Sequence, residues 1–492
     1  MNIEDVDAEL LPAQCRTLLE QGGRLDFAYA WFPEDEAGPE LRYIAHPAQP
    51  GPLQVWRCRP RGRPVPDLAG VAPLMSWYER EMHDMCGVCF ADRAETEPLM
   101  FLPGASASTP PLERGDPRLI YKPIAYALPE IGGPDREDIQ LLPFGPVRAD
   151  VFESAQFVFF YIGEAILHYH AQLFFKHRGM EKRFEGLSPE LGAVLAERVS
   201  GVGSLSHALA YSQAVEQAAG CTVPLRAKVL RVILAELERI YNHLHYLGHL
   251  CHTTTLKVGE AQGKYLEERA KQVNGRVAGE RLLRNVVVPG GLRHDLHLHG
   301  LTFDLQRLQD EFAPYARMLE TSTPHLDRLI TTGLLTRRAA FDQGATGPVE
   351  RASGSSRDMR RDQAYAAYGE LLVYETVRDA GDAHARQQVR IAEIENSFDL
   401  ITQALSRLDP GPVHVPCIPE HGGEGLGWAE SPRGALYYAV HIGGDGRLAR
   451  VKIKSPSFSN WRVFPFTVHD SNMMDYAINE ASFGLTMAGC DR

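Results

Sequence analysis

A proline-dense segment divides the chain of 492 residues into two unequal parts. Nine prolines lie between residues 102 and 146. Each proline fixes its own φ and lacks a backbone N–H, so this density opposes a regular helix or a central strand. We therefore predict a proline-rich linker at residues 102–146, which joins a small domain at residues 1–101 to a large domain at residues 147–492.

The two parts differ in their predicted secondary structure. The first contains short strand-like runs at residues 25–32, 42–46 and 53–57, separated by proline and glycine, which indicates a small α+β domain. The second begins with an aromatic hairpin, residues 157–160 and 165–175 around Gly163. Apolar residues at helical spacing then predict a long helix from Pro224 to about Gly248, and further helices within 301–330 and 374–408.

The last hundred residues return to strands. Runs at 435–442 and 448–453 flank a glycine-rich turn at 443–446, and a short helix is expected near 468–481. The predicted fold class is therefore α+β: a small N-terminal α+β domain, then a mainly helical domain with small β-sheets.

Charge and hydropathy exclude several function classes. The formal net charge of −12 disfavours binding to nucleic acid or to an anionic membrane surface. The most apolar stretch, residues 157–175, is interrupted by Glu164, His168 and His170, so no transmembrane helix is predicted. Eight scattered cysteines and an acidic N-terminus predict a soluble cytoplasmic chain that reaches a membrane only through partner proteins.

Three groups of residues have metal-ligand spacing, and each has a simpler interpretation. Cys86 and Cys89 form a C-x-x-C pair, but no second pair exists, so we favour small semi-buried side chains. The other two groups are histidines: His245, His249 and His252 at helical spacing, and His294, His297 and His299 in a loop. Histidines in such places are more often hydrogen-bonded within the fold than bound to a metal, so we favour that interpretation.

The glycine-rich run at 422–427 invites a phosphate-binding interpretation. It lacks the Lys-Ser/Thr of a P-loop, so a backbone turn is the favoured prediction. No dinucleotide-binding glycine fingerprint is present, so direct NADH binding has no support from the sequence.

Several longer strings resemble one protein family. Residues 77–87, WYEREMHDMCG, are similar to a signature of the C subunit of NADH:quinone oxidoreductase (complex I), with Cys86 at an aromatic position. The remainder resembles the complex I D subunit and the large subunits of membrane-bound [NiFe] hydrogenases of the formate hydrogenlyase type. The matching strings are HRGMEK (177–182), ELERIYNH (236–243), TGPVERASG (346–354), SPRG (431–434) and KIKSPSF (452–458).

The resemblance implies where a nickel–iron centre would be bound, and this chain departs from the pattern there. Four cysteines bind the metals in the hydrogenases, whereas the matching positions here hold Ser200, Gly203, Thr486 and Gly489. His207 matches the histidine that follows the first pair. Neither a hydroxyl nor a glycine replaces a thiolate donor, so we predict no nickel–iron site and no bound metal.

The resemblance also implies a quinone site, which in complex I occupies the vacated cavity. Its tyrosine position falls on Gly201, and its histidine loop reads RADVFE at 148–153, so both quinone hydrogen-bonding groups differ. The polar groups expected at the cavity are Arg433, His207, Glu153 and Arg148. They could pair with one another, bind a polar or quinone-like ligand, or relay protons.

The expected function follows from the resemblance. It implies a large peripheral subunit, at the inner face of the cell membrane, of an oxidoreductase complex with a small iron–sulfur subunit and antiporter-like, ion-translocating membrane subunits. Electrons would pass from the partner's iron–sulfur cluster to a quinone-like or unknown acceptor. The alternative is a non-redox structural or proton-coupling subunit of such a complex.

Overall fold

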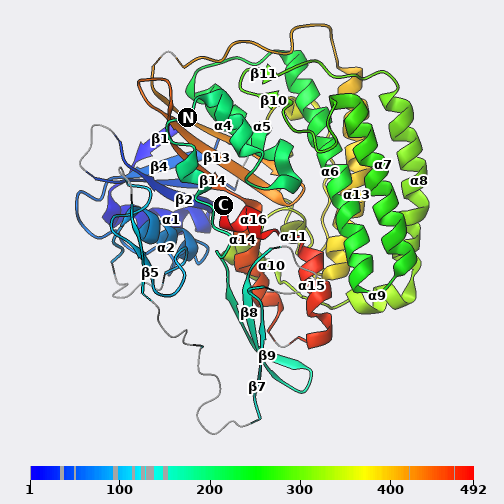
Figure 1. Ribbon diagram of the computed structural model, residues 1–492, viewed down its shortest axis with the longest axis horizontal. Coiled ribbons are helices and arrows are strands. Elements are labelled where there is room, and N and C mark those ends of the chain that lie inside the picture. The colour runs from blue at the N-terminus through cyan, green and yellow to red at the C-terminus, as the bar shows by residue number, and fades with distance from the viewer. Residues whose placement is uncertain are drawn as a thin grey trace.

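The N-terminal part of the computed structural model is a four-stranded sheet with two helices (Figure 1). The structure describes residues 2–33, 38–48, 51–91, 98–113, 117–122, 128, 138–147, 153–419, 421–469 and 471–492. The sheet order is β1-β4-β3-β2, with β1 and β4 parallel, which agrees with the predicted α+β domain. Its elements are β1 (Asn2–Asp5), η1 (Ala8–Leu10), α1 (Leu11–Glu20), β2 (Arg24–Trp31), β3 (Glu40–His46), β4 (Gln54–Cys58) and α2 (Met75–Cys86).

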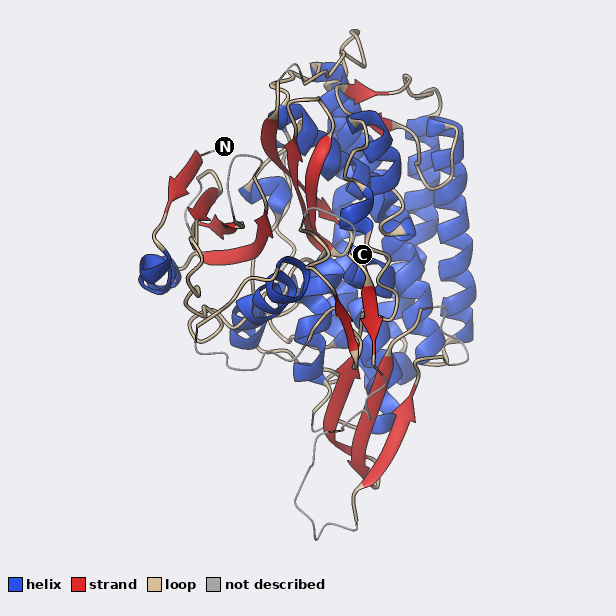
Figure 2. Ribbon diagram, turned by 60° about the vertical axis from the view of Figure 1, so that its left-hand side comes forward, coloured by secondary structure: helices blue, strands red, loops and turns tan. Residues whose placement is uncertain are grey.

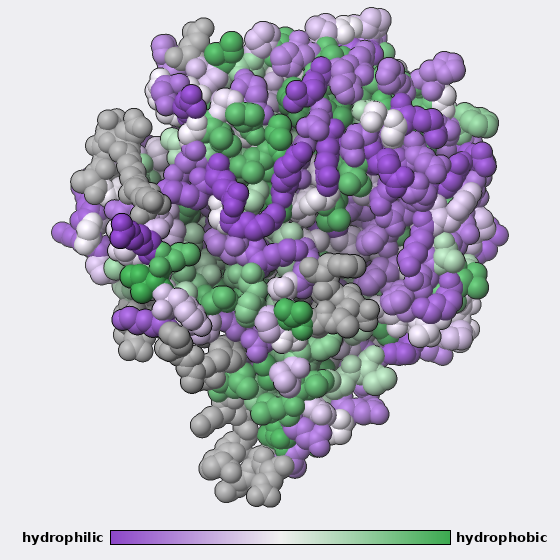
Figure 3. Space-filling view, viewed as in Figure 1, coloured by the Kyte–Doolittle hydropathy of each residue, from purple (hydrophilic) through white to green (hydrophobic). Residues whose placement is uncertain are grey.

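The proline-rich segment contains strands, which the sequence did not predict. β5 (Ala105–Ala107) pairs with β6 (Leu119–Tyr121), and β7 (Gln140–Phe144) joins the predicted hairpin. That hairpin is β8 (Gln156–Ile162) and β9 (Ala165–Gln172), and the resulting sheet projects from the body of the molecule (Figure 2). Pro143 is tolerated because β7 is an edge strand. Apolar side chains gather on this projection (Figure 3), among them the exposed Leu141 and Leu142.

The helical body is built on the predicted long helix, α6 (Leu225–Thr253). It does not end near Gly248 as predicted. Gly248 instead faces Gly263 of α7 (Lys257–Ala278), and a Cβ there would lie 3.4 Å from the Gly263 Cα. The missing side chain therefore permits a close helix–helix approach, and α6 continues for five further residues.

Two other predicted helical stretches are shorter or divided. Residues 301–330 form α8 (Leu301–Thr321) and α9 (Thr323–Leu329), separated at Ser322 with Pro324 at the start of α9. α13 (Ala383–Ser406) begins only after Asp382, whose side chain accepts a hydrogen bond from the Ala385 amide. The predicted helix near 468–481 is a 3-10 turn, η5 (Met473–Asp475), followed by α15 (Tyr476–Phe483).

The glycine-rich run at 422–427 is a strand, so the predicted turn is wrong. β12 (Gly423–Ser431) pairs with β13 (Gly434–Ile442), which pairs with β14 (Leu448–Lys454). Helix α5 (Ser204–Ala218) lies directly on β12. A Cβ on Gly423, Gly425 or Gly427 would collide with a backbone oxygen of α5. The alternating glycines thus allow a helix to pack against strand backbone.

Short elements connect these layers. They are α3 (Met180–Arg183), α4 (Pro189–Ala196), η2 (Gly201–Gly203), β10 (Val287–Val288), β11 (Gly291–Leu292), α10 (Arg337–Gln343), α11 (Pro348–Arg351), α12 (Met359–Asp362), η3 (Tyr368–Glu370), α14 (Pro456–Val463), η4 (Phe464–Thr467) and α16 (Met487–Asp491).

One buried apolar core runs through both parts of the chain, from Val6 to Cys490. Buried polar contacts cross the same boundary. The Tyr437 hydroxyl donates to Asp26 at 2.6 Å, and the Arg24 guanidinium lies 3.3 Å from Glu350. The N-terminal sheet is therefore packed against the large part of the chain. The boundaries at 101/102 and 146/147 stay predictions.

No helix among the residues that the structure describes is both long and apolar enough to span a membrane.

Candidate functional site

Arg178 brings together the two motif segments that are far apart in the sequence. Its guanidinium donates to the backbone oxygens of Arg198 at 3.0 Å and Val199 at 2.6 Å, just before Ser200. It also donates to the backbone oxygen of Ala488 at 3.0 Å, between Thr486 and Gly489. The two segments are thus joined through one side chain, as the motif resemblance predicts for positions that would share one metal centre.

The first segment places Ser200, Gly201, Gly203 and His207 at the start of α5. Ser200 is buried and precedes the turn η2, while the Gly201 oxygen accepts a hydrogen bond from Ser204 at 2.9 Å. His207 is buried and its Nδ1 hydrogen-bonds with the Tyr438 hydroxyl at 2.8 Å. Burial, assisted by the charges of Arg433 and Arg178, lowers the pKa of His207 to about 3, so this histidine is neutral at physiological pH.

The second segment forms the short C-terminal helix α16. Thr486 caps it, because its hydroxyl accepts a hydrogen bond from the Gly489 amide at 3.2 Å and also contacts the Ser457 hydroxyl. A Cβ on Gly489 would lie 2.7 Å from the Thr486 oxygen. The hydroxyl of Thr486 is therefore used in helix capping, and Gly489 has no room for a side chain without movement.

Of the two predicted loop residues, Glu153 lies at this segment. Its carboxylate accepts hydrogen bonds from the backbone amides of Met487 and Ala488, and Lys176 lies 3.6 Å away. Glu153 thus binds the first turn of α16. Arg148 lies outside the described residues.

Arg433 is buried and each of its three nitrogens has a partner. Nε donates to the Gly484 oxygen at 3.1 Å, Nη1 to Asn242 Oδ1 at 3.2 Å, and Nη2 to the Tyr246 hydroxyl. The guanidinium also lies 4.9 Å from the centre of the Tyr246 ring. Among the described contacts, Arg433, His207 and Glu153 therefore do not pair with one another. Each of the three has its own local partners.

Different parts of this chain are similar to two subunits of respiratory NADH dehydrogenase and to a hydrogenase. Residues 5–117 match "Respiratory-chain NADH dehydrogenase, 30 Kd subunit", and residues 265–421 and 416–492 match the corresponding 49 Kd subunit. Residues 178–276 match "Nickel-dependent hydrogenase". The D subunit of the NADH-quinone oxidoreductase of Clostridium beijerinckii is 30% identical over 362 residues, which are 71% of this chain and 96% of that protein.

The chain belongs to the complex I and hydrogenase large-subunit family. Its matches to both the 30 Kd and the 49 Kd subunits make it a fused C/D-type subunit, as the motifs predicted. Formate hydrogenlyase subunit 5 of Escherichia coli is 29% identical over 425 residues, covering 83% of this chain and 74% of that one.

A solved structure has the fold of about three quarters of this C/D-type subunit. A chain of the membrane-bound sulfane sulfur reductase, an archaeal respiratory membrane complex, superposes with a TM-score of 0.69 at 25% identity. The match covers 73% of this chain and all of the other. The predicted mixture of helices and small sheets is confirmed.

A nickel–iron centre does not fit the donor groups at the four positions that match the hydrogenase cysteines, Ser200, Gly203, Thr486 and Gly489. The two serine and threonine hydroxyls are poor replacements for thiolates, and the two glycines supply no donor at all. The neighbouring Cys490 is buried, and burial raises the pKa of its thiol well above the usual value, which opposes a thiolate. Across the described ranges, no group of three or more His, Cys, Asp or Glu side chains is arranged for metal binding.

The other candidate metal groups lie in three separate places, and the two cysteines differ in burial. Cys86 is buried and burial raises the pKa of its thiol to about 12, while Cys89 is exposed. The rings of His245, His249 and His252 lie on one face of α6, as helical spacing predicts. His245 contacts Glu267 at 3.1 Å and His252 contacts Glu260 at 3.1 Å. His294, His297 and His299 are all exposed in one loop, and His294 hydrogen-bonds with the Asp295 backbone oxygen.

Sequence reasoning missed four side chains at this site: Arg178, Asn242, Tyr246 and Glu238. Glu238 is buried, accepts hydrogen bonds from the Leu205 and Ser206 amides, and has a pKa raised by burial. A signal existed for Arg178, because it stands within the HRGMEK string, and for Asn242 and Glu238 within ELERIYNH. Those strings carried the family resemblance, but their contacts depend on tertiary packing.

Proposed function

We propose that this C/D-type protein is the large peripheral subunit of a membrane-bound oxidoreductase complex without a nickel–iron site. It receives electrons from an iron–sulfur cluster in a small partner subunit and passes them to a quinone-like or other acceptor. Ion-translocating, antiporter-like membrane subunits complete the assembly at the inner face of the cell membrane.

One observation carries this proposal: Arg178 joins the two segments that the resemblance matches to the metal-binding motifs, and neither holds a cysteine at the matched positions. The contact between the two segments therefore does not depend on metal donors. Arg433, His207 and Tyr438 are buried polar side chains beside it, and because each already has a local partner, a polar acceptor would bind in exchange for those contacts.

The proposed acceptor site consists of the predicted residues. Arg433, His207 and Glu153 are its proposed polar groups, and Ser200, Gly201, Gly203, Thr486 and Gly489 are its proposed lining positions. Arg148, which lies outside the described residues, stays a candidate from the resemblance alone. Relatives named for a quinone and for sulfane sulfur indicate that this family serves more than one acceptor. The neutral form of His207 provides a hydrogen bond without adding charge.

The complex purified from native membranes through a tag on this chain tests the proposal. We expect a small iron–sulfur subunit and membrane subunits to co-purify. We also expect the reduced cluster, followed by electron paramagnetic resonance, to be reoxidised when a soluble quinone or a polysulfide is added. Arg433→Lys should slow this reoxidation, whereas Arg338→Lys on the exposed surface should not. A complex with no reducible cluster would contradict the redox proposal.

A buried charge network favours the alternative, a non-redox proton-coupling subunit. Glu393 contacts Arg351 at 2.7 Å, His243 at 2.9 Å and Arg239 at 3.5 Å, and all four side chains are almost fully buried. Glu236 extends the network through Arg239 and Arg360. Glu393→Gln separates the two functions: loss of ion transport with normal cluster reoxidation favours coupling as this chain's role, and loss of reoxidation favours electron transfer.

A further inference from the structure

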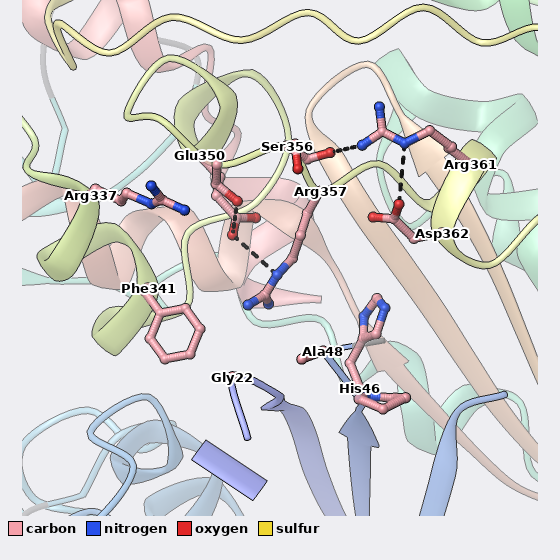
Figure 4. Close-up of a pocket in the computed structure, with 12 residues that line it drawn as sticks. Gly22, His46, Ala48, Arg337, Phe341, Glu350, Ser356, Arg357, Arg361 and Asp362 are labelled. Carbon is pink, nitrogen blue, oxygen red and sulfur yellow. Dashed lines mark hydrogen bonds and ion pairs between the residues drawn. The ribbon is translucent and has the colours of Figure 1, made fainter. Parts of the chain in front are cut away.

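A pocket lies between the N-terminal sheet and the large part of the chain (Figure 4), and neither of the two segments that Arg178 joins lines it. Its volume is about 520 Å³, within the range of small-molecule sites. Three parts of the chain form it: the sheet side with Gly22 and His46, helix α10 with Arg337 and Phe341, and residues 350–362. The proposed function uses none of the residues that line this pocket.

The pocket walls carry more positive than negative side chains. Arg337, Arg357 and Arg361 face two acids, Glu350 and Asp362. Arg361 is already engaged, because it donates to Asp362 at 3.4 Å and to the Ser356 backbone oxygen. Arg337 and Arg357 are therefore the arginines of the pocket that remain to bind an anion.

The acids at the pocket are held by other donors. Glu350 accepts hydrogen bonds from Arg24 at 3.3 Å and from the Ser355 hydroxyl at 3.0 Å. Asp362 accepts one from the Asp358 amide at 2.9 Å. Because both carboxylates are partly neutralised by these contacts, their repulsion of an incoming anion is reduced.

Arg357 and Arg337 have N–H donors that are available to a ligand. Arg357 lies 3.7 Å from Glu350 through Nε, but its buried Nη1 has no hydrogen-bond partner among the described residues. Burial and the nearby Arg24 lower the pKa of Arg357, although Glu350 and Asp26 oppose this shift. Arg337 forms no ion pair with the described residues. Figure 4 shows the side chains of both arginines directed into the space beside Phe341.

We propose that this pocket binds a phosphate-bearing small molecule, whose oxyanion is held between Arg337 and Arg357. Guanidinium groups match the geometry of phosphate oxygens and donate two parallel hydrogen bonds to them. The ring of Phe341, 5.1 Å from the Arg357 guanidinium carbon, gives the same pocket an apolar wall for an organic group. Such a ligand would bridge the N-terminal sheet and the large part of the chain.

Calorimetric titration of the full chain with pyrophosphate, at fixed ionic strength, tests the site. We expect saturable binding, and we expect Arg337→Gln to weaken it by about tenfold because one charged pair of hydrogen bonds is lost. Arg357→Gln should weaken it similarly. Arg337 is exposed, so its replacement leaves the fold intact even if the Arg357 variant unfolds. Titration with ADP distinguishes the source: tighter binding than pyrophosphate indicates an organic phosphate, and equal or weaker binding indicates the free anion.

The matched control is Arg338→Gln. Arg338 adjoins Arg337, carries the same charge, is 92% exposed and pairs with Asp342, outside the pocket lining. Its replacement should change the affinity by less than about twofold, because exposed charges contribute little. No saturable binding, binding unchanged by Arg337→Gln, or an equal loss in Arg338→Gln would each overturn the proposal. The proposal would also be overturned if sodium chloride, added in place of another salt with the ionic strength unchanged, displaced bound pyrophosphate.

Discussion

The carboxylate of Glu153 accepts a hydrogen bond from the backbone amide of Ala488 at 3.0 Å. This contact fixes a loop residue next to the projecting hairpin onto the helix α16, which with its cap Thr486 holds two of the four positions that the resemblance matches to metal-binding cysteines. A carboxylate at this place binds the free amides of the first helical turn, a role that needs no metal.

Replacing Glu153 tests that structural role. Glu153→Gln keeps one acceptor oxygen but loses the charge, so we expect the free energy of unfolding to fall by about 1 kcal/mol. Urea denaturation of the purified chain measures this change. Glu395→Gln, at an exposed position of α13, should have no such effect. An unchanged midpoint for Glu153→Gln would contradict the contact.

Replacing Arg433 and Tyr246 separately tests the buried hydrogen bonds of Arg433, because the two variants lose different numbers of them. Arg433→Met removes three donors and leaves Asn242, Tyr246 and the Gly484 oxygen unsatisfied, so we expect a loss of about 3 kcal/mol of stability. Tyr246→Phe removes only one hydroxyl and should cost about 1 kcal/mol. Equal effects in chemical denaturation would show that the Arg433 guanidinium is not held by these partners.

The sequence predicted the architecture better than the site. Period and turn residues located the hairpin, α6 and the C-terminal strands, because these signals are local. The predictions at Gly248 and at residues 422–427 were wrong. In a sequence, a glycine that ends a helix or forms a turn cannot be distinguished from a glycine that allows another backbone to pack closely against it. Only the packed structure distinguishes Gly248 against Gly263, or β12 beneath α5. The partners of Arg433 come from α6 and the α15–α16 loop, and spacing alone could not reveal them.

Because His207 is buried in its neutral form, we expect the free energy of unfolding to fall in acid. Its pKa is lowered from 6.5 to about 3 by burial and by two arginines, so the unfolded chain binds a proton that the folded chain resists. The stability present above pH 6.5 is therefore lost as the pH falls toward 3. We expect a contribution of about 2 kcal/mol between pH 7.5 and pH 5. Denaturation curves of His207→Gln should lack this slope, and an identical pH dependence in the variant would contradict it.

For Asp491 we expect the free energy of unfolding to depend on pH with the opposite sign. Burial raises the pKa of this carboxyl from 3.8 to about 6, so the folded chain retains a proton that the unfolded chain releases. Its contribution is present below pH 3.8 and is lost as the pH rises through 6, a change of about 3 kcal/mol. Asp491→Asn should therefore become more stable, relative to the parent chain, as the pH is raised from 4 to 7. A difference that stays constant over that range would refute the raised pKa.

The nickel content of the complex, purified from cells grown with nickel, tests the central claim most directly. A membrane-bound hydrogenase prepared in parallel serves as the positive control for metal retention. Because Ser200, Gly203, Thr486 and Gly489 supply no thiolate, we expect iron from the partner's cluster but no stoichiometric nickel in mass spectrometric metal analysis. One nickel atom per chain would contradict the account.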